Sequence, residues 1–185
     1  MKNNGTYIIT EGALDAELIK KILPGEVLDK VKVIFSGGFS SVLSKARSML
    51  IQKPNSQIFI ILDADTTNEF EVQEKNEFIE DYMKIVARGN RFKLFLQVPE
   101  IESVFFEKKD LIERIIGKKL TDLEFEFAKE KPKKNLEVLL GGKSQLKEVM
   151  DKKLTKSILD EIREFDFPKQ LIGHLKDAGE LQRLQ

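Results

Sequence analysis

Carboxylates follow three of the apolar runs in the first part of this chain. Glu11 comes after the first run and Glu102 after the fourth, while Asp63 and Asp65 come after the third. Each run has the apolar and β-branched composition of a buried strand. Because the carboxyl ends of parallel strands meet at one edge of a sheet, we expect these side chains to converge there.

Converging carboxylates repel one another unless a cation lies between them, and oxygen ligands suit Mg²⁺ or Mn²⁺. Asp15 belongs to this set because it lies four residues after Glu11, which is one helical turn. Asp63 and Asp65 alternate on an extended chain, so both are expected to reach one cation. The expected metal ligands are therefore Glu11, Asp15, Asp63, Asp65 and Glu102.

Alternating strands and helices are needed to position these side chains. Strands are predicted at residues 6–10, 31–35, 57–62 and 92–98. Between them, helices are predicted at 13–23, 42–50 and 69–87. The alternation predicts an α/β fold with a mainly parallel four-stranded sheet flanked by helices.

The pattern changes after residue 108, because no further strong strand follows. Helices are predicted at 111–116, around Phe125, at 146–150 and at 154–165, with one last short helix after Pro168. We therefore expect a catalytic core over residues 1–108. Residues 109–185 are expected to form a helical extension packed on that core.

Composition excludes several kinds of site. The 185 residues include no Cys, which excludes disulfides, thiolate nucleophiles and Cys-ligated zinc. The only His is His174, so one chain cannot build a two-His metal site. The formal net charge is zero, which neither supports nor excludes binding to nucleic acid.

No apolar run is long enough to span a bilayer, and the first residues lack the apolar core of a signal peptide, so a cytoplasmic location is expected.

Three motifs in this order resemble the topoisomerase–primase (Toprim) domain. They are Tyr-Ile-Ile-Thr-Glu-Gly at residues 7–12, the pair Gly37-Gly38, and Ile-Leu-Asp-Ala-Asp at residues 61–65. The Toprim domain is known for a glutamate after its first strand and an Asp-x-Asp after its third. The similarity covers about residues 6–106 and implies a Rossmann-like Toprim fold.

The segment Pro-Glu-Ile-Glu-Ser at residues 99–103 resembles Toprim nucleases of the overcoming-lysogenisation-defect type and related phage-defence effectors. That resemblance implies one more acidic residue after the fourth strand, which Glu102 provides, and a lysine beyond it. Lys131, Lys133 and Lys134 are candidates, and Lys131 is taken as the catalytic one. The chain has no Walker loop and no catalytic-tyrosine domain, which argues against a fused ATPase and a topoisomerase.

These observations predict a metal-dependent nuclease that hydrolyses DNA or RNA. The expected catalytic residues are Glu11, Asp63, Asp65, Glu102 and Lys131. Two bound cations would activate water and stabilise the leaving oxygen, and Glu11 is the candidate general acid/base. Expected partners are a nucleic acid substrate and an ATPase or sensor subunit, or further copies of the chain.

Other interpretations of the same residues remain open. The same acids would serve a primase-like nucleotidyl transferase subunit. The chain could also be a non-catalytic module whose helical extension docks a partner. In that case Asp63 and Asp65 would belong to a helix-capping loop, Glu102 would be a surface acid, and the lysines at 131–134 a solvated charge run.

Overall fold

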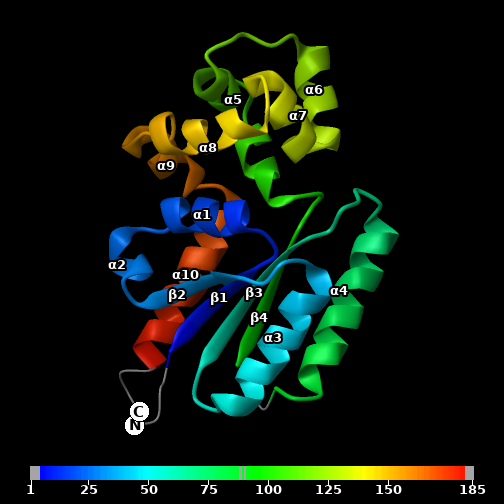
Figure 1. The fold of residues 1–185 in the computed structure, drawn as a ribbon, viewed down its shortest axis with the longest axis vertical. Coiled ribbons are helices and arrows are strands. Elements are labelled where there is room, and N and C mark those ends of the chain that lie inside the picture. Colours follow the sequence, from blue (N-terminus) through cyan, green and yellow to red (C-terminus); the bar gives the residue numbers. More distant parts are fainter. Residues whose placement is uncertain (1–4, 88, 90, 182–185) are drawn as a thin grey trace.

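Four parallel strands form one sheet in the order β2-β1-β3-β4 (Figure 1). They are β1 (Thr6–Thr10), β2 (Val31–Phe35), β3 (Gln57–Asp63) and β4 (Phe92–Gln97). The structure, a computed structural model, describes residues 5–87, 89 and 91–181. All four predicted strands form, and the predicted α/β fold with a parallel sheet is confirmed.

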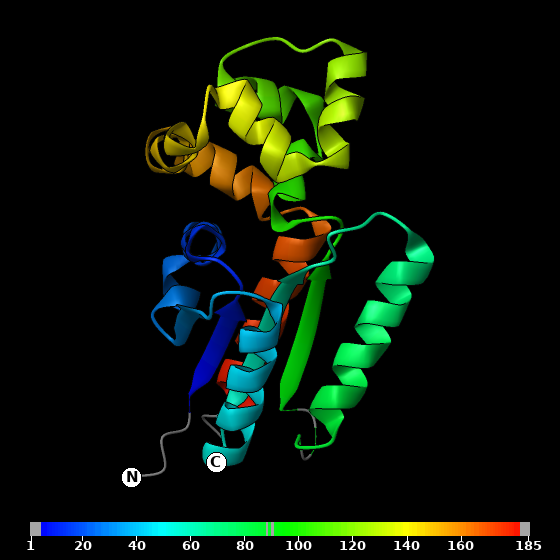
Figure 2. The same cartoon turned by 45° about the vertical axis from the view of Figure 1, so that its right-hand side comes forward.

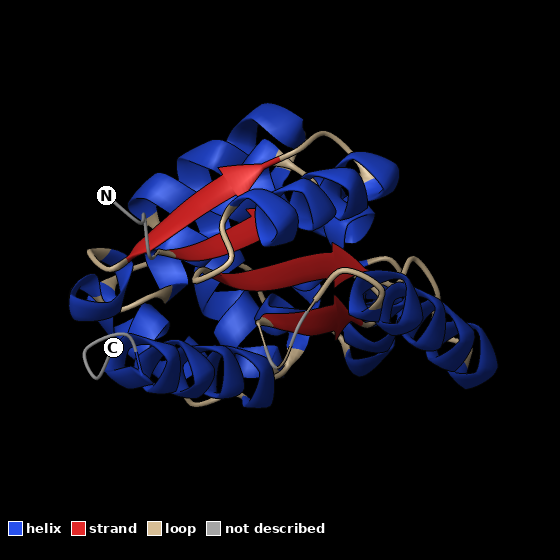
Figure 3. Ribbon diagram, turned by 90° about the horizontal axis from the view of Figure 1, so that it is seen from below, coloured by secondary structure: helices blue, strands red, loops and turns tan. Residues whose placement is uncertain are grey.

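Helices cover both faces of the sheet (Figure 3). Helices α1 (Ala13–Ile22) and α10 (Asp166–Leu181) pack on one face. Helices α3 (Phe39–Gln52) and α4 (Glu69–Lys84) pack on the other, and a short α2 (Gly25–Leu28) precedes β2. The sheet is therefore the middle layer of three.

Side chains of β3 alternate between these two layers. Ile58, Ile60 and Leu62 pack towards α3 and α4, while Phe59 and Ile61 pack towards α1 and α10. All five are almost completely buried, as expected for a central parallel strand that is covered on both faces. This burial fixes the register of β3 and thus the place where Asp63 leaves the sheet.

The remaining helices lie beyond the carboxyl edge of the sheet (Figures 1 and 2). They are η1 (Ile101–Phe106), α5 (Lys109–Ile116), α6 (Asp122–Glu130), α7 (Pro132–Leu140), α8 (Lys143–Lys152) and α9 (Lys156–Ile162). Helices α5, α6 and α7 contact η1, which follows β4 directly. Helices η1 and α5 to α9, which we call the helical part, thus cover the edge at which the carboxylates were expected.

The last helix corrects the prediction for the end of the chain. Instead of a short helix after Pro168, α10 has 16 residues and begins at Asp166. Proline is tolerated there because first-turn N–H groups have no partner within a helix. Leu171 and Leu175 are buried in the layer that also holds Ile8 of β1. Residues after 108 therefore complete, together with α1, one of the two layers that cover the sheet.

Among the residues that the structure describes, none of the helices combines the length and the apolar character needed to cross a bilayer.

Candidate functional site

The segment after β3 brings two strand ends together. Beyond the sheet, Ala64 N donates to Gln97 O at 2.7 Å and Asp65 N donates to Pro99 O at 2.9 Å. This pairing places Ile101 beside Asp63, and Ile101 N donates to Asp63 Oδ1 at 2.8 Å. The first residue of η1 is thereby fixed to the last residue of β3, which sets the position of Glu102, the next residue.

Three carboxylates and one lysine form what we call the Lys133 cluster: Asp15, Asp63, Glu102 and Lys133. Lys133 Nζ lies 3.5 Å from Glu102 Oε1 and 3.8 Å from Asp15 Oδ1. Asp15 belongs to the first turn of α1, where its Oδ2 accepts a hydrogen bond from Gly12 N at 2.8 Å. The cluster thus brings together residues of α1, β3, η1 and α7.

Burial governs the protonation of this cluster. It raises the pKa of Asp63 to about 7, and the charges of Glu102 and Asp15 add to the effect. Burial likewise raises the pKa of Glu102 to about 7, although Lys133 opposes this shift. For Lys133, burial lowers the pKa, but the neighbouring carboxylates outweigh it and hold the pKa above its ordinary value. Lys133 therefore stays charged, while the pKa values of Asp63 and Glu102 lie close to neutrality.

A second group, the Lys75 cluster, consists of Glu11, Asp65 and Lys75. Lys75 Nζ donates to Asp63 O at 2.7 Å, Ala64 O at 3.1 Å and Asp65 Oδ2 at 3.1 Å. Burial raises the pKa of Glu11, and the charge of Asp65 is the next largest cause. Lys75 belongs to α4, so this helix fastens the loop that carries both aspartates.

Asp65 departs from the geometry that the sequence predicted. Its backbone is left-handed, with φ at 61°, and its side chain is 70% exposed. The chain is therefore not extended through Asp63-Ala64-Asp65, and the two carboxylates do not share one side. Asp63 belongs to the Lys133 cluster, and Asp65 pairs with Lys75 instead.

The structure places Lys133, and not the predicted Lys131, beside the carboxylates. Lys131 is exposed where α6 ends and α7 begins. Lys133 lies in the first turn of α7, and its backbone N donates to Glu100 Oε2 at 2.9 Å. Glu100 thus holds the first turn of α7 so that Lys133, and not Lys131, faces the carboxylates.

Within the part of the chain that the structure describes, three buried carboxylate oxygens have no hydrogen-bond donor: Glu11 Oε1, Asp15 Oδ1 and Glu102 Oε2. Such burial is costly unless a positive charge compensates it. By chemistry the donor set therefore fits a hard cation such as Mg²⁺ or Mn²⁺. Yet within the described residues no three acidic side chains are arranged to hold an ion as they stand. In the Lys133 cluster, the positive charge facing the acids is the lysine ammonium.

Sequence reasoning missed Lys75 as a contributor to the site. Lys75 is a single positive charge among the acidic residues in the first half of α4. This pattern was the sequence feature that could have pointed to a role for Lys75. The pair Gly37-Gly38, part of the family resemblance, lies beside Glu11, because Gly37 N donates to Glu11 O at 2.9 Å. Both glycines have positive φ, at 74° and 108°, which explains the residue type at this turn.

No family model matches the chain, no curated protein matches it, and no solved structure matches it.

Proposed function

We propose that this chain is a metal-dependent nuclease that hydrolyses phosphodiester bonds of DNA or RNA. One observation carries the proposal. Acids from three strand ends converge at the sheet edge, and three of their buried oxygens lack a hydrogen-bond donor. A structural ion-pair network would place a donor on each buried oxygen, whereas a site for a cation and a phosphate leaves some free.

The two clusters suggest a division of roles. Asp15, Asp63 and Glu102 would hold one divalent cation, and Glu11 with Asp65 would hold another. Bound Mg²⁺ or Mn²⁺ would supply Lewis-acid stabilisation of the phosphate and activation of water.

The chain's own residues would move the proton and stabilise charge. The pKa of Glu11 is raised by burial and by Asp65, which favours a role as general acid/base. Lys133 keeps its charge and would stabilise the developing negative charge in the transition state. Lys75 positions the loop that carries Asp63 and Asp65.

The resemblance to phage-defence nucleases supports a narrower version of the proposal. In it, the chain is the effector of a complex that includes an ATPase or a sensor. This version predicts that cleavage by the purified chain does not depend on ATP.

The direct test is cleavage of end-labelled single-stranded and double-stranded DNA and RNA, with Mg²⁺, with Mn²⁺ and with EDTA. We expect cleavage only with metal, and we expect its loss in Asp63→Asn and Glu102→Gln. Asp29→Asn changes an exposed acid and should cleave like the wild type. Incorporation of labelled nucleotides without cleavage would show a nucleotidyl transferase instead, and metal-independent cleavage would contradict the proposal.

A further inference from the structure

The charge balance of the Lys133 cluster depends on one side chain from the helical part. Lys133 Nζ lies 3.5 Å from Glu102 Oε1 and 3.8 Å from Asp15 Oδ1. The side chains of Glu102 and Asp15 are only 4% and 7% exposed, and carboxylates buried to this degree need a nearby positive charge. In the described part of the chain, Lys133 is the cationic side chain that is paired with these two acids.

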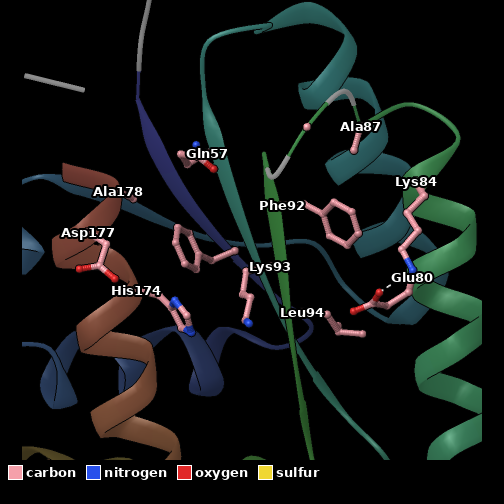
Figure 4. Close-up of a pocket in the computed structure, with 12 residues that line it drawn as sticks. Gln57, Glu80, Lys84, Ala87, Phe92, Lys93, Leu94, His174, Asp177 and Ala178 are labelled. Atoms are coloured by element: carbon pink, nitrogen blue, oxygen red, sulfur yellow. Dashed lines mark ion pairs between the residues drawn. The ribbon is translucent and has the colours of Figure 1, made fainter. Parts of the chain in front are cut away.

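Lys133 also lies on the solvent side of the two acids. Its side chain is 34% exposed, far more than the side chains of Glu102 and Asp15. A cavity of about 450 Å³ lies at the other end of the sheet, beside the amino end of β4 and between α4 and α10 (Figure 4). None of the described residues that line it belongs to the Lys133 cluster. The lysine ammonium, and not this cavity, is therefore what borders Glu102 and Asp15 towards solvent.

The backbone of Lys133 is held in place, while its side chain can change rotamer. Lys133 N donates to Glu100 Oε2 at 2.9 Å, and Leu136, one turn further along α7, is buried in the core. The flexible four-carbon stem of a lysine allows its ammonium to move over several ångströms. The ammonium can therefore leave the acids towards solvent without any movement of α7.

We propose that Lys133 is an internal competitor of the divalent cation: its ammonium occupies the buried acids until the ion displaces it towards solvent. This inference rests on the proposed function, because it concerns the regulation of the same cation site. Two positive charges at the same buried carboxylates repel each other strongly, so the ammonium and the ion exclude each other there. The displaced ammonium stays beside the site, where a phosphate oxygen can replace the carboxylates as its partner.

Calorimetric titration of variants with Mn²⁺ near neutral pH tests the competition. Lys133→Met removes the charge but keeps an unbranched side chain, and we expect it to bind Mn²⁺ at least about tenfold more tightly than the wild type. Lys133→Arg keeps the charge and should bind no more tightly than the wild type. Lys131→Met removes a charge from an exposed residue and should bind like the wild type. A misfolded Lys133→Met would instead bind more weakly.

Chemical labelling tests the displacement in the wild type, where no variant can misfold. Neighbouring carboxylates favour the charged form of an amine, whereas acetylating reagents react with the neutral form. Peptide mass spectrometry measures the acetylation rate of Lys133 against that of the exposed Lys134, with Mn²⁺ and with EDTA. We expect Mn²⁺ to accelerate the labelling of Lys133 severalfold and to leave that of Lys134 unchanged.

The two readouts distinguish failure of this inference from failure of the proposed function. Mn²⁺ binding by Lys133→Met that is equal to or weaker than that of the wild type would overturn the inference. So would acetylation of Lys133 that Mn²⁺ leaves unchanged or slows. Tighter binding by Lys133→Met, together with a wild type that cleaves no nucleic acid, would support the inference and contradict only the nuclease proposal. Absence of Mn²⁺ binding by both proteins would overturn both.

Discussion

Acids at the site differ in their surroundings, and this difference decides their chemistry. Asp63 and Glu102 are held between the sheet and the helical part, and the pKa of each is raised to about 7. Asp65 is exposed and pairs with Lys75. At the residue scale, Asp63 and Glu102 are therefore the acids whose loss should matter most.

The two neighbouring lysines provide a matched pair of variants. Lys133→Met should reduce metal-dependent cleavage by about a hundredfold, because it removes the positive charge beside Glu102 and Asp15. Lys131→Met changes an exposed residue and should keep nearly full activity. Initial rates with both variants measure the difference. Equal loss in both variants, or loss only in Lys131→Met, would contradict the assignment of Lys133.

The raised pKa of Asp63 also predicts how stability depends on pH in metal-free protein. Between its ordinary value of 3.8 and about 7, folded Asp63 keeps a proton that the unfolded chain releases. This contribution to stability is present at low pH and is lost as pH rises through that window, by up to about 1.4 kcal/mol per pH unit. Asp63→Asn should remove this loss.

Urea unfolding in EDTA measures this effect at about pH 5 and about pH 8. At the higher pH we expect Asp63→Asn to be more stable than the wild type, although the proposed function predicts that it is inactive. Asp29→Asn, which changes an exposed acid, serves as the control. If Asp63→Asn were less stable than the wild type at the higher pH, the pKa of Asp63 would not be raised in the folded protein.

Sequence could identify the acids at the site but not the lysines. Glu11, Asp63 and Glu102 each follow an apolar run. The carboxyl ends of parallel strands meet at one edge of the sheet in any order of the strands. To choose Lys133 over Lys131, one must know the residue at which α7 begins. Periodicity alone does not fix the boundaries of a helix. The contacts of Lys75 depend on how α4 packs, which local patterns do not encode.

At the scale of elements, α9 is fastened to α1 by one arginine. Arg163 Nε donates to Ile22 O at 2.7 Å, its Nη2 donates to Lys21 O at 3.4 Å, and its Nη1 pairs with Asp160 at 2.6 Å. The guanidinium thus satisfies carbonyls at the carboxyl end of α1, where a positive charge is also favoured. This contact keeps the helical part against the helix that carries Asp15.

Arg163→Ala should lower the free energy of unfolding by about 1–3 kcal/mol, because it removes charged hydrogen bonds to two backbone carbonyls. Lys152→Ala breaks an exposed pair with Glu148 and should change stability by less than about 0.5 kcal/mol. Urea unfolding of both variants gives the comparison. Equal effects would show that Arg163 does not fasten the two helices.

Strands were easier to predict than the helices after residue 108. Each strand is a short apolar run bounded by turn residues, and the central ones are buried on both faces. Pro168 favoured a short last helix, because proline usually interrupts helices, yet the structure uses it in the first turn of α10. The place of α10 against the sheet is a long-range contact that its own sequence does not reveal.

At the scale of the whole molecule, the sheet depends on both ends of the chain. Residues 1–108 include four strands, but α10 supplies buried residues to one face, among them Leu171 and Leu175. A fragment ending at residue 108 would expose Ile8, Phe59 and Phe95 on that face. We therefore predict that it lacks a cooperative unfolding transition.

Thermal unfolding followed by circular dichroism tests this prediction on the fragment 1–108 and the full chain. The full chain should unfold in one sharp transition, and the fragment should aggregate or unfold gradually. A fragment with a sharp transition of its own would show that residues 1–108 are an independent domain.

Calorimetric titration with Mn²⁺ near neutral pH measures directly whether Asp15, Asp63 and Glu102 form a cation site. We expect saturable binding by the wild type. Asp63→Asn and Glu102→Gln should each weaken it at least about tenfold, which is about 1.4 kcal/mol, and Asp29→Asn should leave it unchanged. No binding by the wild type, or equal binding by all four proteins, would contradict the account.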